Sequence, residues 1–321
     1  MNLESININK KLKIVYMGTP EFSEVVLRGV LENYSLRAIV TQPDHNRTKD
    51  GQVIYSAVKN VALEKTILVL QPENIKNDYE EILALEPDLI ITCAYGQFIP
   101  KEVLDYPKYG CINVHASLLP KLRGGAPIHK AIINGYRKTG VTIMYMNPEM
   151  DAGDIISQKE IDITDDDTAA TLHDKLAILG RDLLLETLPS ILNGTNQRIK
   201  QDPSEVTLAL TLKREDEKID FEKTKRQVFN QVRGLNSWPG AYCLFEGKVL
   251  KVWKCYYTDN IYSNLFNGQI TNIYADGFGV KVNNGEVVFT EVQLEGKQKM
   301  SAIDFLNGIQ DKSKFIGKVL D

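Results

Sequence analysis

The chain has 321 residues, of which 43% are hydrophobic and 25% are charged, and its formal net charge at pH 7 is −4. This length is sufficient for two hydrophobic cores, so we expect two domains. Lys and Arg number 22 against 28 Asp and Glu up to Thr207, and 16 against 14 after it, so the C-terminal part carries a charge of +2. A protein that binds nucleic acid over its whole surface is more basic, so we expect any RNA contact at a local patch.

The cysteines and the hydropathy pattern bear on the cellular compartment. The cysteines show no CxxC or other metal-ligand spacing, and they lie at Cys93, Cys111, Cys243 and Cys255. The chain opens with polar residues rather than with an apolar signal core. No apolar run approaches the roughly 20 residues that are needed to span a bilayer. We therefore expect a reduced, cytoplasmic protein without a membrane segment.

Short apolar runs alternate with helix-like stretches in the first half of the chain. The first run, Lys13–Met17, ends at a Gly-Thr-Pro-Glu turn, in which Pro20 suits the first position of a helix and Glu21 suits its positive end. Further strands are predicted at residues 36–41, 67–70, 88–94, 111–115 and 141–146. Strands that alternate with helices predict an α/β fold with a doubly wound, mostly parallel sheet.

A long helix is predicted to begin after the acidic triplet Asp165–Asp167 and to end at about Pro189. One face of it carries Leu172, Leu176, Leu179 and Leu183. Three neighbouring carboxylates could suggest a metal site, but carboxylates at a helix N-terminus are stabilised by the helix dipole, and we prefer that interpretation. Residues 193–203 are rich in Gly, Asn, Gln and Pro and predict a linker.

After Thr207 the pattern changes to short strands. A helix near residues 223–234 precedes strands predicted at 241–245, 248–257, 268–274, 279–282 and 286–292. Because Gly and Asn turns close these strands, we predict a small antiparallel β-barrel of the OB type. The expected organisation is a Rossmann-like catalytic domain over residues 1–192, a linker over 193–207 and the C-terminal barrel over 208–321.

The strand predicted at residues 111–115 ends with two polar side chains that suit acyl transfer. Asn113 and His115 are two positions apart, so both lie on one face at the carboxyl edge of the sheet, where open parallel sheets bind ligands. Asn113 can donate to a developing oxyanion, and His115 can donate or move a proton near neutral pH. Asp151 follows the strand at 141–146, at the same edge, and could orient His115 and favour its charged form. Taken singly, a histidine is more often structural, and Asp-Ala-Gly-Asp could be an ordinary turn.

The motifs around these residues resemble the folate-dependent formyltransferases. The shared core comprises Asn113-Val114-His115, Ser-Leu-Leu-Pro at 117–120, Arg-Gly-Gly-Ala-Pro at 123–127 and Asp-Ala-Gly-Asp at 151–154. Three further motifs, at residues 17–22, 40–44 and 233–240, are similar to those of family members that act on methionyl-tRNA. The resemblance extends from about Lys11 to Leu320, essentially the whole chain.

The resemblance implies transfer of the formyl group of 10-formyltetrahydrofolate to the α-amine of methionine on initiator tRNA, for translation initiation and without a metal. Asn113 and protonated His115 would stabilise the oxyanion of a tetrahedral intermediate, while Asp151 would hold His115 and help to move protons. The folate is expected in an apolar slot with backbone hydrogen bonds. The expected folate-binding residues are Tyr95, Gly96, Gln97, Phe98 and Ile99 in one loop and Ser117, Leu118, Leu119 and Pro120 in another. We expect a monomer.

The resemblance also implies where tRNA would bind. In the family a basic loop follows Gln-Pro-Asp and enters the acceptor end of tRNA, and residues 45–54 are its equivalent here. This loop carries two cations, Arg47 and Lys49, which Asp50 opposes, so an ordinary solvated loop is the competing interpretation. The barrel would supply the other contacts, through Arg233, Lys248, Lys251 and Lys254. Lysines on exposed strands also serve merely to keep a sheet soluble.

Three alternatives remain open from the sequence. A formyltransferase for an amino sugar nucleotide would share the Asn, His and Asp residues, but we would expect neither the motif at residues 17–22 nor the Gln-Pro-Asp loop. A 10-formyltetrahydrofolate hydrolase would use similar residues with water as the acceptor. A folate-independent nucleotide-binding module is disfavoured, because the turn at residues 18–20 lacks the GxGxxG glycines that let a pyrophosphate approach the backbone.

Overall fold

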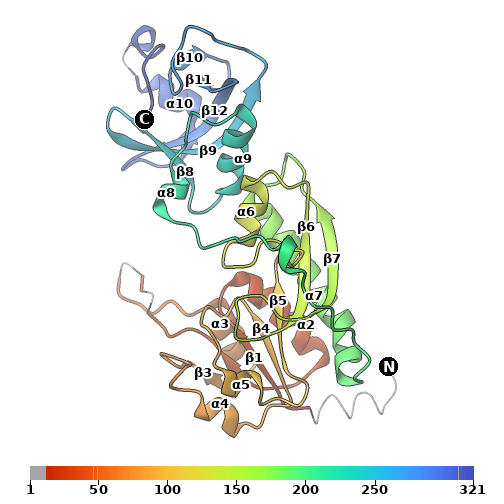
Figure 1. Ribbon diagram of the computed structural model, residues 1–321. Coiled ribbons are helices and arrows are strands. Elements are labelled where there is room, and N and C mark those ends of the chain that lie inside the picture. The colour runs from red at the N-terminus through yellow and green to blue at the C-terminus, as the bar shows by residue number, and fades with distance from the viewer. Residues whose placement is uncertain (1–11, 46, 49, 310) are drawn as a thin grey trace. The chain divides into compact units, whose positions relative to one another are not determined.

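The computed structural model describes residues 12–321 except 46, 49 and 310 (Figure 1). The chain forms two compact units. Unit 1 contains the described residues up to Gly124, together with Thr139–Ile161 and His173–Ala209. Unit 2 contains Gly125–Lys138, Asp162–Leu172 and Leu210–Asp321. Two segments that precede residue 192 thus belong to unit 2, and the domain boundaries at residues 192 and 207 stay a prediction.

Unit 1 is built on a seven-stranded sheet with the order β3-β2-β1-β4-β5-β6-β7. The strands are β1 (Ile14–Gly18), β2 (Leu36–Val40), β3 (Val69–Leu70), β4 (Leu89–Cys93), β5 (Cys111–His115), β6 (Lys138–Tyr145) and β7 (Ile155–Asp162). The first five strands are parallel, and β6 is antiparallel to β5. The prediction of a mostly parallel α/β sheet is confirmed. The sequence analysis missed β7 because this strand at the end of the sheet is polar and largely exposed after Ile156.

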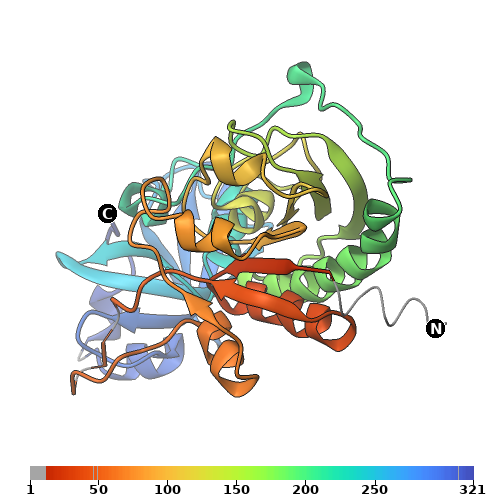
Figure 2. The same cartoon turned by 90° about the horizontal axis from the view of Figure 1, so that it is seen from below.

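Helices cover both faces of this sheet. They include α2 (Glu21–Asn33), α3 (Ala57–Glu64), α4 (Glu80–Ala84), α5 (Lys101–Leu104) and α7 (Ala169–Leu192), and a short 3-10 helix η1 follows at Pro203–Glu205. A Cβ on Gly180 of α7 would lie 3.0 Å from the side chain of Val114, so α7 packs directly on β5. Helix α2 lies beside α7, where Gly29 leaves room for Arg181 (Figure 2).

The opposite face of β5 carries the polar residues of the motif. Cys111 points to this face and is buried against α5, where its Sγ lies 3.5 Å from the Val103 carbonyl oxygen. Because side chains alternate along a strand, Asn113 and His115 share the face of Cys111 and lie on the side of the sheet away from α7. The packing of β5 therefore fixes the direction in which these two side chains point.

The long helix departs from the prediction at its C-terminal end. α7 continues through Pro189 to Leu192, because the missing N–H of Pro189 leaves only one carbonyl of the preceding turn without its helical partner, and Pro189 lies on the exposed side. At the other end, the Asp167 carboxylate accepts hydrogen bonds from Thr164 N, at 2.9 Å, and from Thr171 Oγ1, at 3.2 Å. Asp167 thus fixes the turn before the helix, while the preference for the helix-dipole interpretation of the acidic triplet stays a prediction.

Unit 2 is built on an antiparallel sheet with the order β10-β11-β12-β9-β8, and β13 pairs with β12. The strands are β8 (Ala241–Phe245), β9 (Lys248–Thr258), β10 (Ile270–Ile273), β11 (Phe278–Val282), β12 (Gly285–Leu294) and β13 (Met300–Ser301). Its helices are α6 (Pro127–Ile133), α8 (Arg214–Glu217), α9 (Lys225–Gly234), α10 (Ala302–Asn307) and the 3-10 helix η2 (Lys312–Lys314). The antiparallel arrangement is confirmed, while closure into a barrel stays a prediction.

The core of unit 2 combines an aromatic cluster with one buried carboxylate. The ring of Phe278 lies 5.6 Å from that of Phe289 and 5.1 Å from that of Phe315, centroid to centroid. Glu286 on β12 is fully buried. Its carboxylate accepts hydrogen bonds from the side chains of Thr258, Thr271, Tyr274, Asn260 and Tyr262. Burial by itself raises the pKa of Glu286. The hydrogen bonds, with that from Thr271 as the largest, lower the pKa by more than burial raises it, so the net pKa lies below its ordinary value.

No helix within the described part of the chain combines the length and the apolar character that a membrane span requires.

Candidate functional site

The structure brings Asp151 close to His115, which lies at the end of β5. His115 is 6% exposed, and its Nδ1 lies 3.6 Å from Oδ2 of Asp151. On the other side of the ring, Nε2 lies 3.0 Å from the carbonyl oxygen of Leu122. Because a carbonyl oxygen only accepts hydrogen bonds, Nε2 is the nitrogen that donates to Leu122, whereas the 3.6 Å between Nδ1 and the Asp151 carboxylate exceeds the length of a hydrogen bond.

Asp151 is held in place by backbone groups. Its Oδ2 accepts a hydrogen bond of 2.8 Å from the amide N–H of Gly124, in the Arg-Gly-Gly turn. Its own backbone has a φ of +49°, a left-handed conformation that Asp tolerates better than most residues. Two positions on, a Cβ at Gly153 would lie 1.9 Å from the carbonyl oxygen of Tyr145, so only glycine fits there. The Asp-Ala-Gly-Asp motif therefore encodes a tight loop at the end of β6.

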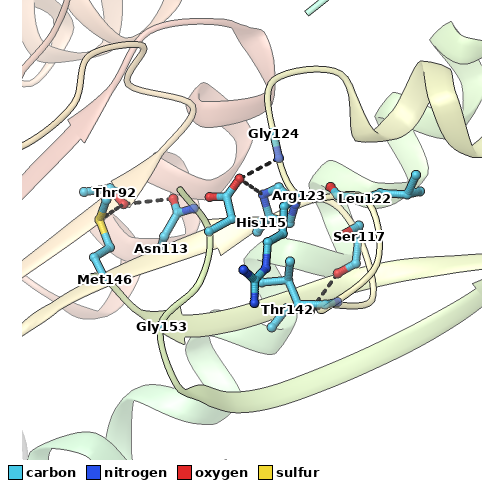
Figure 3. A network of polar contacts seen from close by, with 12 residues as sticks. Thr92, Asn113, His115, Ser117, Leu122, Arg123, Gly124, Thr142, Met146 and Gly153 are labelled. Atoms are coloured by element: carbon cyan, nitrogen blue, oxygen red, sulfur yellow. Dashed lines mark hydrogen bonds and ion pairs between the residues drawn. The ribbon is translucent and has the colours of Figure 1, made fainter. Parts of the chain in front are cut away.

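The amide of Asn113 is oriented by Thr92 on the neighbouring strand β4. Thr92 is buried, and its Oγ1 lies 2.8 Å from Asn113 Oδ1, 3.0 Å from the Ile112 carbonyl oxygen and 3.1 Å from Met146 Sδ. When the hydroxyl donates to Oδ1, the Nδ2 of Asn113 is the end of the amide that can donate to a ligand. Figure 3 shows this amide between Thr92 and His115.

The loop that follows β5 is fixed by side chains from β6 and β7. Thr142 Oγ1 donates to the carbonyl of Ser117, at 2.7 Å, and accepts from the N–H of Leu119, at 3.1 Å. Gln158 Nε2 donates to the Leu119 carbonyl at 2.8 Å, and Ser117 Oγ donates to the Lys121 carbonyl at 2.6 Å. These bonds hold the loop that presents the Leu122 carbonyl to His115. The sequence analysis missed Thr142 and Gln158, which no motif marks.

Tyr95 and Ile99 of the first expected folate loop point into the core. Both belong to the cluster that includes Val15, and burial raises the pKa of Tyr95 to about 12. The Tyr95 Oη is buried without a hydrogen-bond partner within the described part of the chain. Its carbonyl accepts from Thr19 Oγ1, at 3.0 Å, and from Gln42 Nε2, at 2.9 Å.

The other residues of that loop could contact a ligand through their backbone groups and through one exposed aromatic ring. Gly96 has a φ of +94°, and Gln97 accepts from the N–H of Ile75 at 2.9 Å. Phe98 is 63% exposed. In the second loop, Leu119 is buried beside Met144, and Leu118 and Pro120 are half-buried. A ligand along these loops would meet mainly backbone groups and Phe98, and the contact with folate stays a prediction.

The residues expected to contact tRNA differ in their accessibility. Lys49 lies outside the described residues, and Arg47 is exposed, with its guanidinium 2.8 Å from the Asp44 carbonyl oxygen. Lys248 and Lys254 are exposed, and Lys251 is half-buried. Arg233 is 6% exposed and instead donates to Asn230 Oδ1 and to the carbonyls of Thr164 and Asp167. Burial lowers the pKa of Arg233, and its guanidinium makes hydrogen bonds inside unit 2.

Two residues that the sequence analysis missed, Trp253 on β9 and Lys299 just before β13, lie near Lys251 and Lys254 of β9. The ammonium groups of Lys251 and Lys299 each lie 5.3 Å from the ring centroid of Trp253. Glu291 pairs with Lys299 and also with Lys254, at 3.1 Å. Burial, and then the charge of Lys254, lower the pKa of Lys299. We call Lys251, Trp253, Lys254 and Lys299 the Trp253 cluster.

Within the part of the chain that the structure describes, no three His, Cys, Asp or Glu side chains are arranged so that they could hold a metal ion.

The fold and the site define the class of protein. Residues 11–188 match the formyl transferase family, and residues 211–310 match the C-terminal domain of formyl transferases. The chain belongs to this family.

The names of individual relatives are more specific than the description of the family. The chain is 48% identical to a methionyl-tRNA formyltransferase of Geobacillus sp. (strain WCH70) over 303 residues, which cover 92% of this chain and 94% of that protein. It is 49% identical to the methionyl-tRNA formyltransferase of Bacillus licheniformis over 303 residues, which cover 92% of this chain and 95% of the relative.

Solved structures share the fold at lower identity. The N-formyltransferase from Helicobacter canadensis, in complex with folinic acid and dTDP-3-aminofucose, matches with a TM-score of 0.66 and 20% identity, over 90% of this chain and 100% of that one. HypX from Aquifex aeolicus, in complex with tetrahydrofolic acid, matches with a TM-score of 0.60 and 19% identity, over 91% of this chain and 46% of that one.

Proposed function

We propose that this protein transfers the formyl group of 10-formyltetrahydrofolate to the α-amine of methionine on initiator methionyl-tRNA, as a monomer in the cytoplasm. The relatives at 48–49% identity over more than nine-tenths of the chain support this acceptor. The observation that carries the chemistry is the placement of His115 between the Asp151 carboxylate and the Leu122 carbonyl, on the strand that also presents Asn113.

The reaction needs charge stabilisation and proton transfer. The free α-amine attacks the formyl carbon, a new C–N bond forms, and the formyl oxygen becomes an oxyanion. The amine then loses a proton, and N10 of the folate gains one. The oxyanion re-forms its C=O bond as the bond from carbon to N10 breaks, which yields formylmethionyl-tRNA and tetrahydrofolate.

The three residues at the end of β5 and β6 suit these steps. Asn113 Nδ2 donates a hydrogen bond to the oxyanion, and the positive charge of the His115 imidazolium stabilises the same negative charge. Asp151 holds His115 by its Nδ1 and helps to move the proton from the amine towards N10. The loops at residues 95–99 and 117–120 are the proposed folate site, in which backbone groups and Phe98 provide the contacts.

For tRNA we propose the Trp253 cluster and Lys248 on unit 2 and Arg47 on unit 1. Lysines neutralise phosphates, and an indole ring offers a face on which an unpaired base can stack. Arg233, whose guanidinium is buried and hydrogen-bonded, is left out of this proposal.

An assay with three acceptors tests the proposed function. The protein is incubated with 10-formyltetrahydrofolate and methionyl initiator tRNA, an amino sugar nucleotide or water alone. We expect formylmethionine with the tRNA and little folate turnover otherwise. Equal turnover in all three reactions would favour the hydrolase, and a product with the sugar alone would favour the sugar formyltransferase.

Asn113→Ala tests the oxyanion contact within the same assay. Loss of one oxyanion donor typically lowers turnover by about 10²–10³-fold, and we expect kcat to fall by that amount. Asn193→Ala, at an exposed position after α7, is the matched control and should keep wild-type turnover. A kcat for Asn113→Ala close to that of the control would contradict the assigned role.

A further inference from the structure

Gln201 joins the two loops that hold His115. Its Oε1 accepts hydrogen bonds from Arg123 Nε, at 3.0 Å, and from Arg123 Nη2, at 2.8 Å. Its Nε2 donates to the carbonyl oxygens of Asp151 and Gly153, both at 2.8 Å. An amide side chain has two donor hydrogens and two acceptor lone pairs, so every hydrogen-bonding position of Gln201 is used.

The two loops contact opposite nitrogens of the imidazole. The loop at residues 121–124 presents the Leu122 carbonyl to Nε2, and the loop at residues 151–154 presents Asp151 to Nδ1. The segment after Gln201 also binds the first loop, because Arg123 N donates to the Thr207 carbonyl, at 2.9 Å, and Ala209 N donates to the Arg123 carbonyl, at 2.7 Å. The amide of Gln201 extends this attachment to the second loop.

The Asp151 loop needs such an attachment. With a φ of +49°, Asp151 adopts a backbone conformation that a residue with a side chain seldom keeps without support from its surroundings. The Gly124 N–H fixes the carboxylate, whereas the two donated bonds of Gln201 fix the carbonyls on either side of Ala152. The position of the Asp151 loop is therefore set by Gly124 through the carboxylate and by Gln201 through the two carbonyl groups.

We propose that Gln201 is a positioning residue for formyl transfer, which sets the separation of Asp151 and His115 by tying the Asp151 loop to Arg123. This inference rests on the proposed function for the reaction that it affects. Without the two donated bonds, the Asp151 carboxylate is no longer held against His115 Nδ1. The substrates lose no direct contact, so kcat falls while KM is largely kept.

Gln201→Glu is the decisive variant. Glutamate keeps the shape of the side chain and two acceptor oxygens for Arg123, but it has no N–H for the carbonyls of Asp151 and Gly153. We expect kcat to fall roughly ten-fold to a hundred-fold, the cost of a small misplacement of a reacting group. KM for both substrates should stay within about three-fold, and the pH profile of kcat should shift because His115 loses its fixed carboxylate partner. Gln197→Glu makes the same change at an exposed position of the same segment and should behave as wild type.

A measurement without substrate separates this inference from the proposed function. In protein with isotope-labelled histidine, the imidazole nitrogen signals of His115, assigned by their loss in His115→Ala, report hydrogen bonding of the ring. Gln201→Glu should move these signals, and Gln197→Glu should leave them in place. If wild type formylates no methionyl-tRNA and yet Gln201→Glu alone moves the signals, the proposed function fails and the positioning role stands. If Gln201→Glu keeps the wild-type signals, the inference is overturned, even where the variant loses activity through a lower melting temperature.

Discussion

Asn113 and His115 were predictable because both lie on one strand, whereas Thr92 was not. The register of β4 and β5 places Thr92 opposite Asn113, and strand register cannot be read from a single sequence. Gln201 was missed because its partner Asp151 lies 50 positions away in the sequence, and because the composition of its segment predicted only a linker. The residues that carry the chemistry were thus visible in motifs, while those that orient them depend on tertiary contacts.

Removal of the Thr92 hydroxyl should impair turnover without a change in shape. Thr92→Val removes the donor to Asn113 Oδ1, and the amide is then free to turn its oxygen towards the oxyanion. Because such a hydrogen bond contributes about 1 kcal/mol, we expect kcat to fall about five-fold with KM nearly unchanged. Thr92→Ser restores the hydroxyl and should recover most of the loss. Equal kcat values for the Val and Ser variants in steady-state formylation assays would refute this role.

At the scale of elements, periodicity and turn residues located most strands within a few residues. β5 and β8 have their predicted bounds, whereas β7 was missed because its polar pattern resembles a loop. The end of α7 was misplaced because a proline on an exposed helix face does not stop a helix that is buried on its other side. The buried Glu286 could not be foreseen, since its donors come from β9, β10 and the loops that flank them.

Glu286 should make the sheet of unit 2 sensitive to acid. Its pKa is lower in the folded state than in the unfolded chain, so its contribution to stability is fully present above the unfolded-state pKa of about 4.3 and is lost as the pH falls through the folded-state value. Glu286→Gln should lower the free energy of unfolding at pH 7 by about 2–3 kcal/mol and weaken its dependence on acid pH.

Urea unfolding followed by tryptophan fluorescence measures this effect, because both tryptophans, Trp238 and Trp253, lie in unit 2. Glu246→Gln is the control, since Glu246 is exposed and pairs with Lys318 at the surface. Its free energy of unfolding should change by less than about 0.5 kcal/mol. Identical acid titrations of wild type and Glu286→Gln would exclude the proposed contribution.

At the scale of the whole molecule, composition predicted two parts with different charge. The net charge of −4 means that attraction to RNA must come from particular surfaces, and the Trp253 cluster is the surface that we propose for unit 2. The sequence analysis identified Lys251 and Lys254 but missed Lys299, because these residues come together only through the pairing of β12 with both β9 and β13.

The salt dependence of tRNA affinity tests this surface. Each lysine that neutralises a phosphate adds roughly 0.7–0.9 to the slope of log K against log salt concentration. We therefore expect Lys254→Ala and Lys299→Ala each to reduce that slope by about this amount, measured by fluorescence anisotropy with labelled tRNA. Lys159→Ala, on β7 of unit 1, is the control and should keep the wild-type slope. A slope unchanged in all three variants would remove the cluster from the proposed interface.

The composition of unit 2 limits how this protein can be recombined with its relatives. α6 and the start of α7 belong to this unit, where His129 contacts the Gly234 carbonyl at 2.8 Å and Arg233 donates to the carbonyls of Thr164 and Asp167. A chimera joined at the linker would take the two sides of these contacts from different parents, so the hydrogen bonds of Arg233 and His129 would depend on how well the segments of the two parents fit together. The C-terminal part therefore packs with two segments that precede the linker, so an exchange of unit 2 with a relative has to carry residues 125–138 and 162–172 with it.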